Sequence, residues 1–254
     1  MHSDMAETSP IPVFLGYDRR VPVVSQVAVH SIQRRASRPV SVTQLVVSGL
    51  QASGLMTRPL QGNQSTEFSF SRFLVPHLAG YDGWAIFMDN DVVLQADIAE
   101  LWALRDDRYA VMCVQHDHVP SESTKFLGQQ QTRYEKKNWS SVMLLNTARC
   151  RALTPDYVNT ASGLDLHRFH WLEGDHEIGA LPAEWNFLID YSAGDPAAQK
   201  LLHYTDGGPY YASHLDCQAA SVWTAERDDM LRADERSLAD VFPDEFRPDE
   251  LAKT

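Results

Sequence analysis

The feature that most constrains the fold is an apolar run, WAIFMDNDVVL at positions 84–94, which leads directly into two aspartates. A run of this kind, preceded by the turn signal YDG, predicts a strand buried in the centre of a sheet. Its end delivers Asp89 and Asp91, and two neighbouring carboxylates are costly to bury because they lose hydration and repel each other. The sequence therefore predicts that something cationic lies at this strand end.

Strand-like and helix-like segments alternate along the first half of the chain. A helix is predicted over 23–32, where apolar residues recur at helical spacing, and others over 65–78 and 96–104. Pro76 must kink or end the second of these helices. Short apolar or β-branched runs predict strands at 11–18, 39–47, 84–88, 109–115, 138–146 and 201–204. This order predicts an α/β domain with a mainly parallel central sheet flanked by helices, which binds ligands at the carboxyl ends of its strands.

Composition divides the chain into three parts. Residues 1–10 form a polar tail, residues 11–215 contain the predicted α/β domain, and residues 216–254 form an acidic, helical C-terminal extension. A loop rich in glycine, serine and glutamine is predicted over 48–65. The length of 254 residues suits one large domain with such an appendage.

Net charge and cysteine usage narrow the partners and the compartment. The formal charge of −12 argues against a large nucleic-acid interface, which needs a basic face. No stretch reaches the roughly 18 apolar residues of a transmembrane helix, and the first residues lack the pattern of a secretory signal. The three cysteines are far apart and in no metal-binding spacing, so we expect reduced thiols and a cytoplasmic protein.

The Asp-x-Asp pair can direct two carboxylates at one divalent cation. Carboxylate oxygens suit Mg²⁺ or Mn²⁺, which also hold substrate phosphates. In the alternative, the pair is only a turn in which Asp91 caps the next helix, although Asp97 is the better-placed cap. The string IFMDNDVV also fits haloacid-dehalogenase-like phosphatases, with Asp89 as nucleophile and Asp91 as general acid and base. That motif usually lies on the first strand of those enzymes, whereas at least two predicted strands precede it here.

Five segments in order, spanning residues 13–211, together resemble glycosyltransferase family 8, which contains glycogenin and the bacterial lipooligosaccharide galactosyltransferases. They are VFLGYD, SFSRFLVPHLAGYDGWAIFMDNDVVLQADIAELWAL, SSVMLLNTARCR, GDHEIGALPAEWNF and LLHYTDGGPYY. The resemblance implies a GT-A fold and a retaining sugar transfer from a nucleotide-sugar, most often a UDP-sugar, with Mn²⁺ or Mg²⁺.

The resemblance implies that Asp89, Asp91 and His203 ligate the metal. Imidazole suits divalent transition metals, and the strand-like LLHY would deliver His203. Without the family, a histidine on an apolar strand would more often be a satisfied core residue. The metal would stabilise the negative charge that grows on the departing diphosphate, and the departing phosphate would take the proton of the acceptor.

Two further positions are implied to act on the donor sugar. Arg72 would contact the sugar or its diphosphate, although an ion pair with Glu67 or Asp82 explains it equally well. Asp175, followed by His176, would lie beneath the reacting sugar and contact its hydroxyl groups. In the alternative, which is compatible with that role, Asp175 caps a helix over HEIGAL.

Residues implied to bind the donor nucleotide follow the first strand, accompany the aspartates, or lie near the end of the matched region. They are Gly16, Tyr17, Asp18, Asn90, Gly207 and Gly208, in addition to Arg72. For Tyr17 and Asp18 the alternative is an ordinary turn between a strand and a helix. The implied acceptor is a glycan, a lipid-linked sugar, a protein or a small molecule.

Three departures from the family pattern mark a divergent member. Where the family has a phosphate-binding lysine before proline, this chain has Gly208, so another cation or the amides of Gly207 and Gly208 would replace it. The candidate cations are Arg19, Arg20, Lys136 and Lys137. The family's Asn-Ala-Gly is replaced by Trp139-Ser140-Ser141, and its Asp-Gln-Asp by Asp175-His176-Glu177. These departures leave a non-catalytic nucleotide-sugar-binding protein as an alternative.

Overall fold

The computed structural model describes residues 9–59, 66–117, 124–125, 129–130 and 135–235. Six strands form the central sheet in the order β2-β1-β3-β8-β5-β9. Their bounds are β1 Ile11–Gly16, β2 Val40–Leu45, β3 Trp84–Met88, β5 Val111–Cys113, β8 Val142–Asn146 and β9 Ile178–Ala180. Within this sheet β8 runs antiparallel to both neighbours and the other pairs are parallel, so the predicted mainly parallel sheet is confirmed.

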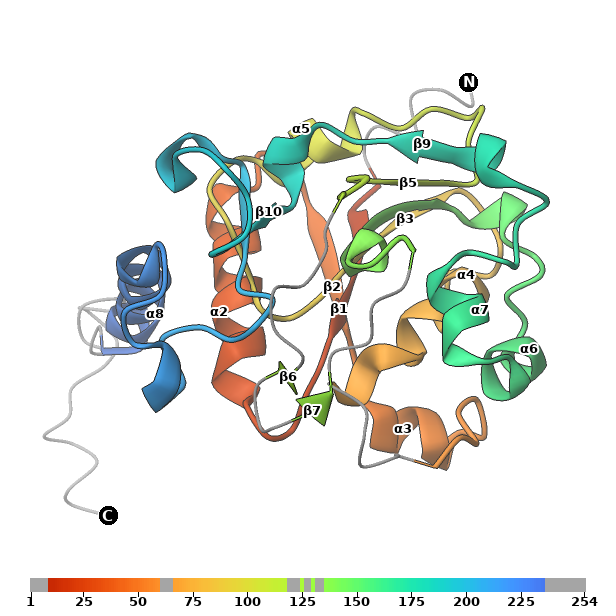
Figure 1. The fold of residues 1–254 in the computed structure, drawn as a ribbon, viewed down its shortest axis with the longest axis horizontal. Helices are drawn as coiled ribbons and strands as arrows, with labels where there is room; N and C mark the ends of the chain where they lie inside the picture. Colours follow the sequence, from red (N-terminus) through yellow and green to blue (C-terminus); the bar gives the residue numbers. More distant parts are fainter. Residues whose placement is uncertain (1–8, 60–65, 118–123, 126–128, 131–134, 236–254) are drawn as a thin grey trace, which may run out of the picture.

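Helices cover both faces of this sheet (Figure 1), because side chains along its strands alternate between two cores. Val13 and Leu15 of β1 belong to a core with residues of α2 and α5. Phe14 of β1 and Phe87 of β3 belong to the other core, with residues of α3, α4, α6 and α7. The helix bounds are α2 Pro22–Arg35, α3 Val47–Ala52, α4 Val75–Leu78, α5 Ile98–Trp102, α6 Pro155–Thr160, α7 Gly163–His167 and α8 Ala220–Glu235.

A second sheet extends the aspartate turn and positions it. Its strands, in order, are β10 Phe187–Leu188, β11 Leu201–His203 and β4 Val92–Leu94. β11 pairs antiparallel with β4, and the register places His203 opposite Val92. This pairing brings the histidine next to Asp91, which precedes β4. The remaining strands, β6 Thr124–Lys125 and β7 Gln129–Gln130, form a separate antiparallel pair.

Two predictions about the segment between β2 and β3 are wrong. The predicted loop over 48–65 contains most of α3, and the predicted helix over 65–78 consists of two 3₁₀ turns, Glu67–Ser69 and Ser71–Leu74, followed by α4. Pro76 lies in the first turn of α4, where a missing N–H is tolerated, so it helps to begin a helix rather than to end one. These turns bury their aromatic and aliphatic side chains against the sheet without forming a regular helix.

Helix α8 packs along α2 (Figure 1), which agrees with the helix predicted near the C-terminus. Trp223 is buried, and Glu226 is buried between His30 Nδ1 at 2.6 Å and the Arg35 guanidinium at 2.8 Å. The division of the chain at residue 216 stays a prediction. In the part of the chain that the structure describes, no helix combines the length and apolarity needed to cross a bilayer.

Candidate functional site

Three side chains converge where β3, β4 and β11 meet. Asp89, Asp91 and His203 each offer a ligand atom, and these atoms lie within 4.8 Å of one another. Asp89 directly follows β3, Asp91 precedes β4, and His203 ends β11. Tyr204 N donates to Asp91 O at 2.9 Å, which extends the pairing of β11 with β4. The sheet thus joins side chains that are more than a hundred positions apart in the sequence.

The donor set of this cluster fits a divalent cation. Asp91 Oδ1 is shielded from solvent and accepts no hydrogen bond from any residue that the structure describes, and His203 Nε2 lies 3.3 Å from it. The alternative role of Asp91 as a helix cap is filled by Asp97, which accepts from Ala99 N at 2.9 Å. Two carboxylates and one imidazole are ligands that suit Mn²⁺, and the carboxylates also suit Mg²⁺.

The second ring nitrogen of His203 is also engaged. Nδ1 lies 2.9 Å from Asn186 Oδ1, and the Asn186 amide nitrogen donates to Ser141 Oγ at 2.9 Å. All three side chains are buried. Sequence reasoning assigned no site role to Asn186, although it lies in the WNF string of a matched segment, where a polar residue between two aromatic ones was an available signal.

Arg72 lies against the aspartates. Its Nη1 is 2.8 Å from Asp89 Oδ1 and donates to the Ser140 carbonyl at 2.9 Å. The alternative ion pair with Glu67 is not formed, because Glu67 pairs with Arg19 at 2.7 Å. With 5% of its surface exposed, Arg72 supplies a positive charge beside Asp89 from within the protein.

The turn between β1 and α2 is built around Asp18. Its buried carboxylate accepts from Arg20 N at 3.0 Å, from Arg20 Nε at 2.8 Å and from Glu67 N at 3.3 Å. Burial raises the pKa of Asp18, but the hydrogen bonds and charge of Arg20 outweigh that effect and the pKa is lowered overall. A Cβ on Gly16 would lie 2.5 Å from the Phe68 ring, so the approach of this ring requires glycine.

Tyr17 and Asn90, two predicted nucleotide contacts, differ in their surroundings. Asn90 is buried, and its amide donates to Ser25 Oγ of α2 at 3.1 Å. It therefore ties the aspartate turn to that helix. Tyr17 is only partly buried, beside the Asp18 turn. Their contacts with a donor stay predictions.

The loop after β11 carries two tyrosines that sequence reasoning missed. Burial and, next, the charge of Asp91 raise the pKa of Tyr210 well above its usual value. Burial and, next, the charge of Asp18 raise the pKa of Tyr211 to about 12. Burial is the larger cause in both tyrosines, and the acidic residues of the site and of the β1–α2 turn add to it. The PYY string after the glycine pair was the signal available in the sequence.

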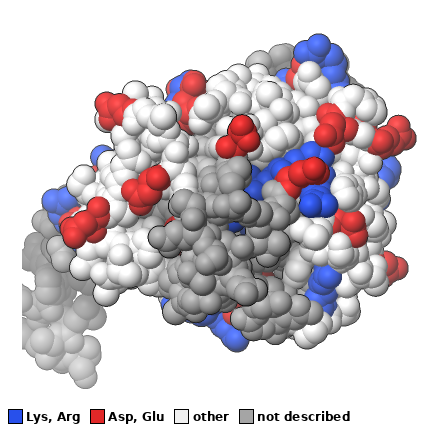
Figure 2. Space-filling model, in the orientation of Figure 1, with Lys and Arg blue, Asp and Glu red and all other residues white. Residues whose placement is uncertain are grey.

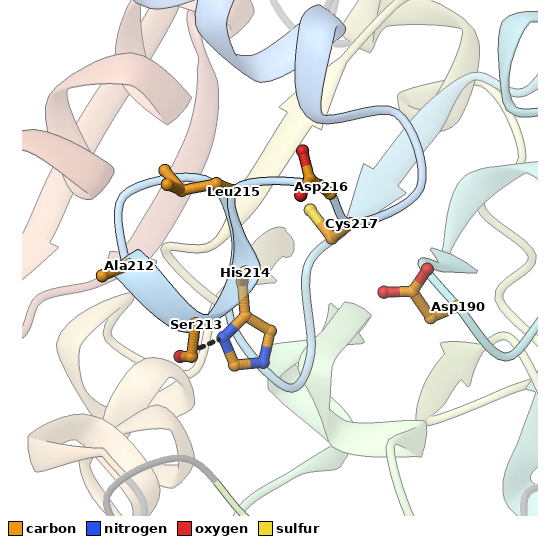
Figure 3. A pocket seen from close by; sticks show the side chains of 7 residues that line it. All are labelled: Asp190, Ala212, Ser213, His214, Leu215, Asp216 and Cys217. Atoms are coloured by element: carbon orange, nitrogen blue, oxygen red, sulfur yellow. Dashed lines mark hydrogen bonds between the residues drawn. The ribbon is translucent and has the colours of Figure 1, made fainter.

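The glycine pair shapes this loop. Gly207 has φ of 123°, in the region that favours glycine, and a Cβ on Gly208 would lie 2.6 Å from the Tyr210 ring. Beyond the pair, Asp190 and residues 212–217 line an open pocket of about 370 Å³ (Figure 3). Asp190 Oδ1 accepts from Gln218 N at 2.9 Å, and this hydrogen bond joins the two segments that line the pocket.

Asp175 and His176 lie on an exposed 3₁₀ turn and do not join the cluster. The Asp175 side chain is 76% exposed and lies 2.6 Å from Lys136 Nζ. The helix that was the alternative for residues 176–181 is wrong, because residues 178–180 pair with β5 as strand β9. Asp175 therefore caps no α-helix there, and its contact with sugar hydroxyl groups stays a prediction.

The basic residues predicted to replace the family's lysine are engaged within the protein. Arg19, Arg20 and Lys136 form ion pairs with Glu67, Asp18 and Asp175, respectively, and Lys137 is buried. On the face drawn in Figure 2, acidic and basic side chains of the described residues are mixed, with a small basic group beside the residues drawn in grey. This mixture differs from the continuous basic face typical of nucleic-acid-binding proteins.

The sequence of this chain matches a family model and a curated protein. The family model described as "Glycosyl transferase family 8" matches residues 20–159. The curated protein named "Protein CDI" from Arabidopsis thaliana is 46% identical over 237 residues, which cover 91% of this chain and 91% of that protein.

Comparisons with solved structures show the same fold at low identity. The glycosyltransferase GlyE of Streptococcus pneumoniae TIGR4 is 12% identical with a TM-score of 0.58, covering 88% of this chain and 63% of GlyE. The galactosyltransferase LgtC, solved with donor and acceptor sugar analogs, is 12% identical with a TM-score of 0.53, covering 86% of this chain and 96% of LgtC. The bifunctional glycosyltransferase WbbM is 15% identical with a TM-score of 0.55. The match covers 86% of this chain and 50% of WbbM.

Proposed function

We propose that this chain, which belongs to glycosyl transferase family 8, uses a divalent metal to transfer a sugar from a UDP-sugar to an acceptor with retention of configuration. The family makes the chain a glycosyltransferase; the metal, the donor and the stereochemistry are the proposal. The observation that carries it is the convergence of Asp89, Asp91 and His203 within 4.8 Å. Such a cluster suits the cation that a diphosphate leaving group needs.

Asp89, Asp91 and His203 would hold Mn²⁺ or Mg²⁺ in this mechanism. When bound, the ion would neutralise negative charge that develops on the departing diphosphate. Arg72 would hold Asp89 in place through its 2.8 Å contact, and its positive charge would offset part of the repulsion between the two carboxylates. A role for Arg72 on the diphosphate itself remains part of the proposal.

The donor would lie along the carboxyl ends of β1 and β3. Tyr17 and Asp18 would contact the base and ribose, and the amides of Gly207 and Gly208 would face the phosphates. The glycines themselves are packed against aromatic side chains of the same loop, so it is their backbone N–H groups that the proposal directs at the phosphates. Asp175 and His176 would face the sugar.

Retention would follow from attack on the same face that the diphosphate leaves. The acceptor oxygen would form its bond to the anomeric carbon as the bond to the phosphate oxygen breaks, and that phosphate oxygen would take the acceptor's proton. The atoms then balance without a separate catalytic base. The retaining course rests on the family resemblance, and the acceptor class is open among glycans, lipid-linked sugars, proteins and small molecules.

The two alternatives have different standing. Membership in the family disfavours a phosphatase with Asp89 as nucleophile. A binding protein without turnover is separated from an enzyme by experiment. Thermal unfolding is measured with a panel of nucleotide-sugars, each with Mn²⁺ or with EDTA. We expect UDP-sugars to raise the melting temperature only with the metal, and the donor to be hydrolysed slowly without acceptor.

Two outcomes would refute the proposal. Stabilisation by Mg²⁺ with a phosphate mimic, but by no nucleotide-sugar, would indicate phosphatase chemistry. Metal-dependent donor binding with no hydrolysis and no transfer to any acceptor would indicate a binding protein. The anomeric configuration of a transferred sugar, read by NMR, tests retention, and an inverted product would contradict that part of the proposal.

A further inference from the structure

A chain of hydrogen bonds connects His203 to a backbone carbonyl behind the metal cluster. Ser141 Oγ donates to Asn138 O at 2.6 Å, the Asn186 amide donates to Ser141 Oγ at 2.9 Å, and Asn186 Oδ1 lies 2.9 Å from His203 Nδ1. Asn186 is 0% exposed and His203 is 1% exposed. Bulk water therefore does not compete for these bonds.

The carbonyl at one end fixes the direction of every bond in this chain. Asn138 O can only accept, so the single hydroxyl proton of Ser141 points to it. Ser141 Oγ must then accept from Asn186, which turns the amide NH₂ group toward Ser141. The amide oxygen consequently faces His203 Nδ1 and requires a proton there.

A proton on Nδ1 leaves Nε2 of the neutral imidazole without a proton, so that its lone pair can act as an acceptor or a metal ligand. That lone pair faces Asp91 Oδ1, which lies 3.3 Å away and also carries only lone pairs. Two such acceptors repel each other unless a cation lies between them. We infer that Asn186 and Ser141 are positioning residues, which hold His203 in the tautomer whose Nε2 binds the metal.

Ser141 is a departure from the family pattern that contributes directly to this arrangement. It stands where the matched family segment has the glycine of Asn-Ala-Gly, and a glycine has no hydroxyl group to relay the bond from Asn138. The backbone also contributes, because Asn138 has φ of 65° and begins the 3₁₀ turn Trp139–Ser141. Asn138, the residue with left-handed backbone, thus supplies the carbonyl at which this series of hydrogen bonds ends.

The inference rests on the proposed metal role of His203, but its first test needs no metal. Long-range ¹H–¹⁵N NMR of the imidazoles, in metal-free protein well above the usual histidine pKa of about 6.5, identifies which nitrogen carries the proton. We expect His203 to carry it on Nδ1 in the full chain. A proton on Nε2 with Nδ1 bare would overturn the inference.

Asn186→Leu removes the acceptor at similar size. We expect the Nδ1 preference of His203 to be lost and the Mn²⁺ dissociation constant, measured by calorimetry, to rise about 10- to 100-fold. Ser141→Gly should weaken the preference and raise the constant by about 10-fold or less, since Asn186 still lies 3.4 Å from Asn138 O. Asn186→Asp keeps an oxygen toward Nδ1, so the proton should stay on Nδ1 and Mn²⁺ binding should recover toward the wild-type value.

Ser140→Ala is the matched control, because Ser140 Oγ lies 2.8 Å from a different histidine, His167. It should leave the His203 signals and the Mn²⁺ affinity unchanged. Equal weakening by Asn186→Leu and Asn186→Asp, with wild-type folding by circular dichroism, would overturn the positioning role. If the wild type shows the Nδ1 tautomer but binds no Mn²⁺, the proposed metal function fails while the assigned tautomer stands.

Discussion

Two acidic regions of the molecule were both predicted to act on the donor, and they are built in opposite ways. Asp89 and Asp91 lie in the turn between strands β3 and β4 and are largely enclosed, with Arg72 and His203 beside them. Asp175 lies on a 3₁₀ turn with most of its side chain in solvent and a lysine 2.6 Å away. The first region places two carboxylates close together inside the protein, whereas the second holds one carboxylate largely in solvent beside a mostly enclosed lysine.

The difference shows which surroundings of a carboxylate indicate a metal-binding site. A surface carboxylate with water and a lysine has its interactions satisfied, so its presence indicates little. An enclosed Asp91 oxygen with no hydrogen bond from the described residues, 3.3 Å from an imidazole nitrogen, lacks that satisfaction. A cation at the proposed metal site would supply the interaction that this oxygen lacks.

Removal of the arginine should produce the largest effect and sharpen this contrast. Arg72→Met leaves Asp89 enclosed without its cation, so we expect the free energy of unfolding in urea, without metal, to fall by about 3–5 kcal/mol. Mn²⁺ should restore part of that loss. Lys200→Met, which breaks the more exposed pairs with Glu100 at 3.0 Å and Glu184 at 3.6 Å, should cost under about 1 kcal/mol. Comparable losses in the two variants would break the comparison.

Neutralising one aspartate should mainly change metal affinity. Because even outer-shell changes weaken metal sites 10- to 100-fold, Asp91→Asn should raise the Mn²⁺ dissociation constant by at least about 100-fold in calorimetry. Without metal the same variant should be as stable as the wild type or more so, since one repelling charge is gone. Wild-type Mn²⁺ binding by Asp91→Asn would refute the metal assignment. Asp175→Asn is the control and should bind Mn²⁺ normally.

Acid should test the third carboxylate, Asp18, by its pKa. That pKa is lowered in the folded protein, so its contribution to stability is present above the unfolded value of 3.8 and is lost as the pH falls through the folded value. Asp18→Asn should therefore flatten the acid limb of a plot of the urea midpoint against pH. An unchanged slope below pH 3.8 would show that the turn at Arg20 does not hold the carboxylate as described.

The smallest change in stability is expected at the exposed turn. Asp175→Asn should alter the free energy of unfolding by less than about 1 kcal/mol, because the Asp175 side chain is 76% exposed and Lys136 Nζ also donates to the Arg168 carbonyl at 3.0 Å. If Asp175 contacts the donor sugar, kcat should fall while the Mn²⁺ affinity stays constant. A weaker Mn²⁺ affinity in this variant would place Asp175 in the metal site and remove the distinction between the two regions.

The sequence predicted the buried strand that leads to the aspartates, for a physical reason. The run ending at Met88 is apolar on both faces, so its burial in a sheet follows from local pattern alone. The helix predicted over 65–78 was wrong because its apolar spacing is equally compatible with 3₁₀ turns that pack on the sheet. Local pattern cannot distinguish two conformations that bury the same side chains.

The other half of the site depends on contacts that no local pattern encodes. Lys136 meets Asp175 across 39 positions, and Asn186 meets Ser141 across 45 positions. Each partner is an unremarkable polar residue in its own segment. These contacts become visible only when the sheet brings the segments together, so the family resemblance pointed to His203 but not to Asn186 behind it, and it gave Lys136 only as a candidate phosphate contact.

Helix α2 contacts both the C-terminal helix and the aspartate turn. Along α2, Ser25 receives a hydrogen bond from Asn90 and Ser31 Oγ receives one from Leu94 N at 3.1 Å, while its last turns hold Glu226 of α8. Loss of α8 would therefore destabilise α2, the helix to which the aspartate turn is hydrogen-bonded. In native-state hydrogen exchange, the amides of β4 and α8 should open together, with protection that rises and falls as one.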